Sequence, residues 1–288
     1  MITFGQLQTR YLDLTKDASS TNTTRGQNRI NEVNQSIISM EDWRFLDKDR
    51  TATSVASQQS YQLPADYGRL LGFWVVVGGV TYYPTEVNDI EYWQQLNSTS
   101  VLSDITTHFY IIEDAIYLYP KPSSTAVTIH LFYKQKAKQL SASDYTTGTI
   151  SSTVGSKTVT GSGTTWTSAM AGRWIDISGR WYEISTASTT SITLVKYALD
   201  TVSGATYTLG ELSPIPSEFH DLLLLGPVAS FYDFKGDKNT YRLEYEKRLL
   251  MLSKRYKGGQ KTNTQILRRV DRSRVSLSNP NNYPTGLS

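Results

Sequence analysis

Residues 148–194 have the sequence GTISSTVGSKTVTGSGTTWTSAMAGRWIDISGRWYEISTASTTSITL. Ser, Thr and Gly dominate this stretch and its surroundings from residue 145 to 210, and charged residues are sparse there. Short β-branched and aromatic runs alternate with turn glycines, a pattern typical of closely spaced strands. About 65 residues of this kind predict a small all-β domain, a sandwich or a barrel, inserted into a larger domain.

The residues before this insert predict two helices followed by a β region. Thr3 can cap a first helix, and a second helix is expected over 24–42. The apolar residues of the first helix lie at three- and four-residue steps: Phe4, Leu7, Tyr11 and Leu14. From residue 43 to 139 the hydrophobic period shortens toward two. The strands expected there cover 51–56, 70–77, 80–83, 109–112, 115–119 and 127–134. Gly78 and Gly79 are expected to form one hairpin turn, and Glu113 and Asp114 a second. A short helix is expected over 87–96, with Val87, Ile90 and either Trp93 or Gln94 on its inner side.

Helical periodicity returns after the insert. Pro214 and Pro216 suit the start of a helix, which Pro227 is expected to kink or split. Asp237 is expected to cap a last helix. Its inward face would carry Tyr241, Tyr245, Leu249 and Leu252. Glu244 and Arg248 would form an i, i+4 pair on an adjacent face.

Together these patterns predict an α+β fold with a helical bundle and a β-sheet region. Both would belong to one discontinuous domain made of residues 1–144 and 211–258, with the inserted all-β domain at 145–210. Residues 259–288 contain few large apolar side chains, so burial would not offset the entropy of ordering them alone. We therefore expect them to form an extended C-terminal arm.

The charge of the chain is divided unevenly. The total formal charge is +3, but residues 254–274 carry eight Lys or Arg side chains against Asp271 alone, a net charge of +7. The remaining residues 1–253 therefore carry −4. A basic segment of this kind can be a solvated tail, a nucleic-acid contact or a docking segment for a more acidic protein. No nucleic-acid-binding motif accompanies it, which favours the other two interpretations.

Few residues suggest catalysis. Cys is absent, and His108, His130 and His220 do not have the spacing of a metal site. The carboxylate pairs at 41–42 and 113–114 are better explained by turn chemistry than by acid–base catalysis. The sequence predicts that the protein is not an enzyme and has no catalytic residues, cofactor or metal site.

Membrane insertion is not expected either. The N-terminus lacks the basic and apolar regions of a secretory signal. The longest apolar runs, 70–80 and 222–229, are much shorter than the roughly 20 residues that span a bilayer. These features predict a soluble intracellular protein, or one released by lysis.

Three tryptophans of the insert leave an alternative open. Trp166, Trp174 and Trp181 could form a platform for sugars, which would make the protein carbohydrate-binding or carbohydrate-cleaving. They could equally form the core of the small domain, because so short a β domain needs large side chains for stability. We favour the core interpretation.

Several motifs, in their order along the chain, resemble the head-to-tail adaptor proteins of tailed bacteriophages. A YxLP segment, Tyr61, Leu63 and Pro64, begins the β region. A YPxP hairpin follows at 119–122, and a Pro-led helical pair runs over 216–245. The insert resembles a β module of phage structural proteins, with its signature at 161–166, 172–174 and 181–184. The resemblance covers about 85% of the chain.

The resemblance implies a structural virion protein. It implies a homo-oligomeric ring, commonly of twelve copies, that lies under the portal protein and links the capsid to a tail or nozzle protein. Double-stranded DNA would pass through its channel without sequence specificity, past an acidic body that repels it. The C-terminal arm would dock on the portal through Lys261, Arg268, Arg269, Arg272, Arg274 and Tyr283.

The expected location is the head-to-tail interface of the virion, after synthesis in the host bacterial cytoplasm. The insert alone would equally allow another tail or baseplate protein.

Overall fold

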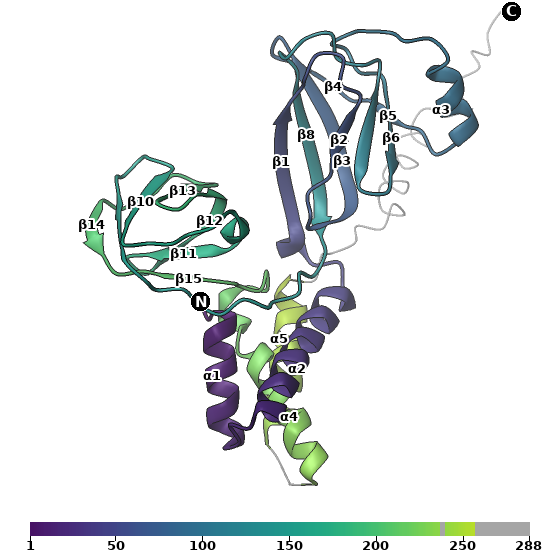
Figure 1. Cartoon of the computed structure of the whole chain (residues 1–288). Coiled ribbons are helices and arrows are strands. Elements are labelled where there is room, and N and C mark those ends of the chain that lie inside the picture. Colours follow the sequence, from purple (N-terminus) through teal and green to yellow (C-terminus); the bar gives the residue numbers. More distant parts are fainter. Residues whose placement is uncertain (237–239, 257–288) are drawn as a thin grey trace, which may run out of the picture.

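The computed structural model describes residues 1–236 and 240–256. Four helices form a bundle at the bottom of Figure 1, and two β lobes lie above it. One lobe is a sandwich of two four-stranded sheets, and the other is a seven-stranded sheet that we call the module. Helices and strands are segregated in space, so the fold is α+β as expected.

The bundle forms where apolar residues recur at helical spacing. Its helices are α1 (Phe4–Thr15), α2 (Ser20–Met40), α4 (Leu222–Lys235) and α5 (Tyr241–Tyr256). Thr3 caps α1 as predicted, because its side chain accepts a hydrogen bond from the Gln6 backbone amide. The buried faces of the four helices share one core with Trp43, which follows α2. This core includes Phe4, Leu7, Ile30, Ile37, Leu222, Leu223 and Leu252.

One helix prediction is corrected in its bounds, and one of the two alternatives for Pro227 is excluded. The second helix begins at Ser20 and not at residue 24, because Ser19 caps it and the polar residues that follow lie on its exposed side or bond within the bundle. Pro227 does not split α4, which runs unbroken past it. Proline removes only one backbone donor, and close packing of the buried helix outweighs that loss.

The last helix presents the inward face predicted for it. Leu252 is buried, and Tyr245 and Leu249 pack against the same core. The predicted Glu244–Arg248 pair is replaced, however: the Arg248 side chain lies 2.6 Å from Asp221 at the start of α4. The predicted cap Asp237 lies outside the described residues.

The sandwich consists of two antiparallel-rich sheets around one core. The first sheet has the order β1 (Asp47–Thr53), β8 (Thr128–Gln135), β3 (Tyr67–Val77), β4 (Val80–Tyr82). The second has the order β2 (Ser60–Gln62), β7 (Ala115–Tyr119), β6 (His108–Ile112), β5 (Thr85–Glu86). Alternate residues of both sheets meet in between, including Phe73, Val75, Phe109, Leu118, Ile129 and Tyr133.

The hairpins of the sandwich lie where the sequence places them. Gly78 and Gly79 both have positive φ, 57° and 83°, as a tight two-residue turn requires. The strand expected at 51–56 is wrong in its bounds, because β1 begins at Asp47 and includes charged residues. The short strands β2 and β5 were not predicted, since neither has enough residues to show a period.

The short helix of the sandwich starts later than expected. The helix α3 covers Ile90–Leu96 and is capped by Asp89, whereas the prediction began at residue 87. Val87 is buried as expected, but Ile90 is 45% exposed and does not face inward. Trp93 is the buried residue of α3, and its ring stacks on Tyr110 of β6 with centroids 5.5 Å apart.

The module has a core of its own. Its strands are β9 (Thr149–Ser152), β10 (Thr158–Ser162), β11 (Trp174–Ile177), β12 (Arg180–Ala187), β13 (Ser191–Leu194), β14 (Val202–Ala205) and β15 (Thr208–Gly210). They pair in the order β14-β9-β10-β13-β12-β11-β15. The pairing therefore gives one sheet with two edges, where the sequence left a sandwich or a barrel open. Its core includes Ile150, Val159, Trp166, Ile175, Ile184 and Leu209.

The chain enters and leaves the module at one place. Tyr145 and Leu209 exchange two backbone hydrogen bonds of 2.8 and 2.9 Å. Just outside them, the Thr3 hydroxyl donates to the Asp144 carboxylate at 2.5 Å. The buried Glu211 carboxylate accepts hydrogen bonds from the Ser141 and Ala142 amides. These bonds attach both ends of the module to the top of the bundle.

Candidate assembly surfaces

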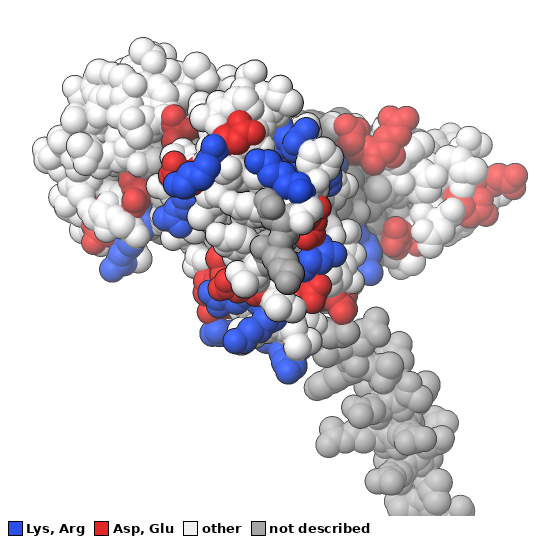
Figure 2. Space-filling model, turned by 90° about the horizontal axis from the view of Figure 1, so that it is seen from below, with Lys and Arg blue, Asp and Glu red and all other residues white. Residues whose placement is uncertain are grey.

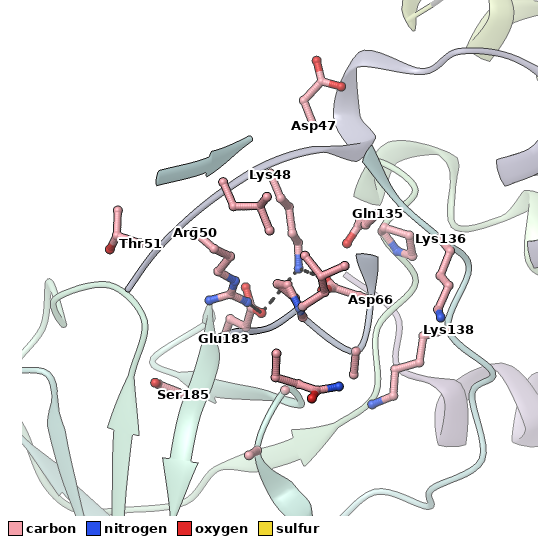
Figure 3. A pocket seen from close by; sticks show the side chains of 18 of the residues that line it. Asp47, Lys48, Arg50, Thr51, Asp66, Gln135, Lys136, Lys138, Glu183 and Ser185 are labelled. Atoms are coloured by element: carbon pink, nitrogen blue, oxygen red, sulfur yellow. Dashed lines mark hydrogen bonds and ion pairs between the residues drawn. The ribbon is translucent and has the colours of Figure 1, made fainter. Parts of the chain in front are cut away.

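A cleft of about 920 Å³ separates the sandwich from the module. The exposed side of β1, residues 135–139 and parts of β11 and β12 line it. In Figure 3, Lys48, Arg50, Asp66 and Glu183 point toward one another inside the cleft, while Lys136 and Lys138 lie along another wall. The cleft is therefore the place where the two β lobes meet through charged side chains.

Ion pairs join the lobes across this cleft. Arg50 Nη2 lies 2.7 Å from Glu183 Oε1, and Lys48 Nζ lies 3.5 Å from the same oxygen. Lys48 also bonds Asp66 at 2.9 Å. Lys48 and Arg50 alternate along β1, so they lie on the same face of that edge strand. Glu183 comes from β12 of the module, more than 130 residues away in the sequence.

The carboxylate of Asp66 is held ionised in this network. Burial alone would raise its pKa, but the hydrogen bonds from Lys48 and Tyr133 outweigh burial, and the pKa is lowered. The Tyr133 hydroxyl donates to Asp66 at 2.7 Å, and burial together with this bond raises the tyrosine pKa. The base of the cleft is therefore a fixed network of charges at neutral pH.

Replacing Glu183 by glutamine is expected to weaken the attachment of the module to the sandwich. The change removes the negative charge that Lys48 and Arg50 share. Because the pairs are partly exposed to water, we expect the contact between the lobes to lose about 1 kcal/mol of stabilisation. The Cys-free chain allows spin labels at Ser100→Cys and Thr190→Cys, one on each β lobe. The distance distribution between the labels should broaden.

The matched control is Glu32→Gln, which removes an exposed pair with Arg29 on α2. This variant should leave the distribution unchanged. High salt should broaden the distribution of the parent chain toward that of Glu183→Gln, because ions screen the pairs. An equally narrow distribution in Glu183→Gln would show that the ion pairs do not hold the lobes together.

The residues predicted to bind the portal are not placed by the structure. Lys261, Arg268, Arg269, Arg272, Arg274 and Tyr283 all lie outside the described residues. The described part of the basic segment is the end of α5. There Arg255 lies 2.8 Å from Glu218, and the exposed Lys254 is next to it. Figure 2 shows basic and acidic side chains mixed over the underside of the bundle.

The histidines are not brought together. His130 lies in β8, as predicted, where its ring stacks on Trp74 with centroids 5.1 Å apart. His220 is 1% exposed at the start of α4 and bonds the backbone of Ile2 and Ile215. Burial lowers its pKa, which favours the neutral ring. Among residues 1–236 and 240–256, no group of three His, Cys, Asp or Glu could hold a metal ion.

The three tryptophans of the module have different environments. Trp166 is 2% exposed and donates a hydrogen bond to the Tyr207 hydroxyl at 2.8 Å, so it belongs to the core. Trp174 and Trp181 are half-buried on the outer face of β11 and β12, and Trp174 lines the cleft. Trp166 therefore cannot form part of a sugar platform at the surface.

The cleft network was not predicted from the sequence. The only local signal was the alternation of charge in Asp47-Lys48-Asp49-Arg50, which is unusual in a strand and typical of an exposed edge. No sequence pattern around Glu183 indicates these partners, because Glu183 lies in the insert, more than 130 residues from β1. In the part of the chain that the structure describes, no helix has the length and apolar character needed to cross a membrane.

Comparisons with known proteins give one family. A family model described as "SU10 adaptor protein" matches residues 2–154, which include α1, α2 and the sandwich. A search of curated proteins found no match. Among solved structures, the flagellar hook junction protein FlgK from Burkholderia pseudomallei is 9% identical with a TM-score of 0.12. That alignment covers 89% of this chain and 61% of FlgK, and so low a score carries no structural argument.

Proposed function

Because the chain belongs to the SU10 adaptor protein family, we propose that this phage structural protein forms a ring under the portal and links the capsid to the tail. The observation that carries the proposal is the match over residues 2–154, which covers the helical pair and the whole sandwich. The motifs in the β region and the Pro-led helices after the module support it. A heterologous ring needs two different faces on each copy, which a body with three lobes supplies.

The proposed role is assembly and not catalysis. The ring would contain about twelve copies, as the family resemblance implies, and double-stranded DNA would pass through it without sequence-specific contacts. The body of residues 1–253 carries −4, so acidic side chains lining the channel would repel DNA phosphates and keep the DNA from adhering. A ring whose channel is lined mainly by Lys and Arg would contradict this part of the proposal.

The C-terminal arm would dock on the portal. Its basic residues lie within a short stretch, and an arm that wraps around a partner adds contact area without a flat preformed patch. Arginine is suited to this role because its guanidinium group binds carboxylates through two parallel hydrogen bonds. The anchors would be Lys261, Arg268, Arg269, Arg272, Arg274 and Tyr283.

The test is binding to the portal protein encoded by the same phage genome. Deleting residues 259–288 should abolish binding, whereas the circular dichroism and melting temperature of the chain should stay unchanged. Replacing Arg268, Arg269, Arg272 and Arg274 by alanine should also weaken binding strongly. Lysine at the same four positions retains the charge, so this variant should lose much less of its binding to the portal.

Full portal binding by the truncated chain would overturn the role of the arm. Failure of the complete chain to bind the portal, or to form rings on it in negative-stain electron microscopy, would overturn the adaptor function.

A further inference from the structure

Two exposed patches lie on different lobes of the molecule. In Figure 1 the module is on the left with β14 at its outer edge, and α3 projects on the right from the far side of the sandwich. Exposed apolar side chains gather at both places, although the bundle and the sandwich bury most of theirs. Apolar groups left in water at defined positions indicate contact surfaces.

The first patch, which we call the module tip, is formed by two adjacent turns. The Gly155 amide donates to the Ala198 carbonyl, and the Ala198 amide donates to the Ser156 carbonyl, both at 2.8 Å. These bonds place three exposed apolar residues together: Val154 (58% exposed), Tyr197 (60%) and Leu199 (60%).

The charge of the module tip is positive. Lys157 Nζ lies 5.0 Å from the centroid of the Tyr197 ring, and Lys196 is exposed beside it. The nearby Asp200 is paired with Arg180 at 3.4 Å. The tip therefore presents an apolar surface with two lysines that no ion pair within the described residues neutralises.

The second patch, which we call the α3 face, is formed by α3 and the loop after it. Its exposed apolar residues are Ile90 (45% exposed), Tyr92 (43%), Leu102 (53%) and Ile105 (42%). Tyr92 packs edge-on against His108 of β6, and Leu102 is bridged to Lys121 just after β7. These contacts fix the face on the second sheet of the sandwich.

The charge of the α3 face is negative. Glu86, Asp89 and Glu91 are exposed around α3. Residues 70–133 contain six acidic side chains and only one basic side chain, Lys121, which gives a net charge of −5. In Figure 2, which keeps the left and right of Figure 1, the lobe on the right shows Asp and Glu side chains at its projecting end.

We propose that the module tip of one copy docks on the α3 face of the next copy in the ring. The two patches are apolar at their centres, opposite in charge and placed on different lobes of one chain. Such an arrangement produces a heterologous contact, which repeats around a ring. This inference rests on the proposed ring. It adds which surfaces form the ring contact and assigns the module a function in it.

The contact is tested with charge reversals in the full chain. Lys157→Glu with Lys196→Glu makes the tip acidic, and Glu86→Lys with Glu91→Lys makes the α3 face basic. Asp89 is left unchanged because it caps α3. Each reversal places like charges in contact, so the concentration needed to complete a ring should rise at least about tenfold. A chain with all four changes has the opposite charges restored and should complete rings again.

The measurement is the number of copies bound per portal ring, by mass photometry and negative-stain electron microscopy. The parent chain should fill portal rings cooperatively. The tip and face variants should still bind through their arms, but without cooperativity and with incomplete rings. Arg10→Glu on α1 with Lys247→Glu on α5 makes the same change in net charge as the tip variant and should leave completion unaffected. Circular dichroism verifies that each variant is folded.

Complete, cooperative rings of the tip and face variants would overturn the inference while the adaptor function stands. Failure of the fourfold variant to recover rings, after the separate pairs have lost them, would overturn it as well. If the parent chain does not bind the portal at all, the adaptor function itself fails. The two failures are therefore distinguished by the behaviour of the parent chain.

Discussion

Replacing Trp166 by alanine is expected to unfold the module while the bundle and the sandwich stay folded. Trp166 is 2% exposed, and its indole N–H donates to the Tyr207 hydroxyl at 2.8 Å. Its ring also fills the space beside Gly161, where an added Cβ would come within 2.7 Å of it. Truncation of a buried tryptophan costs about 3–5 kcal/mol. A domain of about 65 residues has little more stability than that.

The module should unfold alone because its core is separate. The buried residues of the module form one cluster that includes none from the bundle or the sandwich. Hydrogen exchange measured by mass spectrometry should show fast exchange across 149–210 in Trp166→Ala and unchanged exchange in α1, α2 and β8. Trp181→Ala is the matched control, since Trp181 is only half-buried and should cost less.

The outcome of this experiment also tests how the chain is divided into domains. We propose that residues 145–210 form an independent domain within a discontinuous one. Fast exchange throughout the chain after Trp166→Ala would show that the module and the remaining lobes unfold as one unit, and the division would be wrong.

Replacing Trp43 by alanine is expected to destabilise the bundle strongly. Trp43 is fully buried, and its indole N–H donates to the Ile37 carbonyl at 2.6 Å. Its ring stacks on Phe45 with centroids 5.5 Å apart. Its backbone carbonyl accepts a hydrogen bond from Lys134 of β8. Alanine keeps this carbonyl, so the loss comes from the buried ring and its indole hydrogen bond, and we expect the free energy of unfolding to fall by about 3–5 kcal/mol.

Urea unfolding followed by far-ultraviolet circular dichroism measures this loss. The helical signal should disappear at a lower urea concentration in Trp43→Ala. The control Trp74→Ala also removes an indole, but Trp74 is half-buried and stacks on His130 at the surface of the sandwich. Similar midpoints for the two variants would contradict the role given to Trp43.

The order of elements could be predicted because it depends on local patterns. The spacing of Phe4, Leu7 and Tyr11 identifies α1 and its buried face, and all three are buried. The same holds for the inward face of α5 and for the Gly78–Gly79 hairpin, whose glycines adopt the positive φ that the turn requires. Each of these signals lies within a few residues of the element that it predicts.

The remaining features depend on residues far apart in the sequence. Glu183 pairs with Arg50 across the cleft, and neither residue has a local pattern that indicates the other. The expected Glu244–Arg248 pair gave way to Asp221 because the neighbouring helix offers a closer carboxylate. The module tip likewise arises from turns about 40 residues apart that two hydrogen bonds join. These features depend on tertiary contacts, which local sequence patterns do not indicate.

The joined ends of the module have a consequence for engineering. Tyr145 and Leu209 are adjacent partners in a β bridge, so the 63 residues between them leave and rejoin the chain at the same point. A foreign domain whose own termini lie close together could occupy this position without stretching the bundle. A fluorescent protein or an affinity tag placed there would replace the module tip as well, so this chimera should keep a folded bundle and sandwich but lose the proposed ring contact.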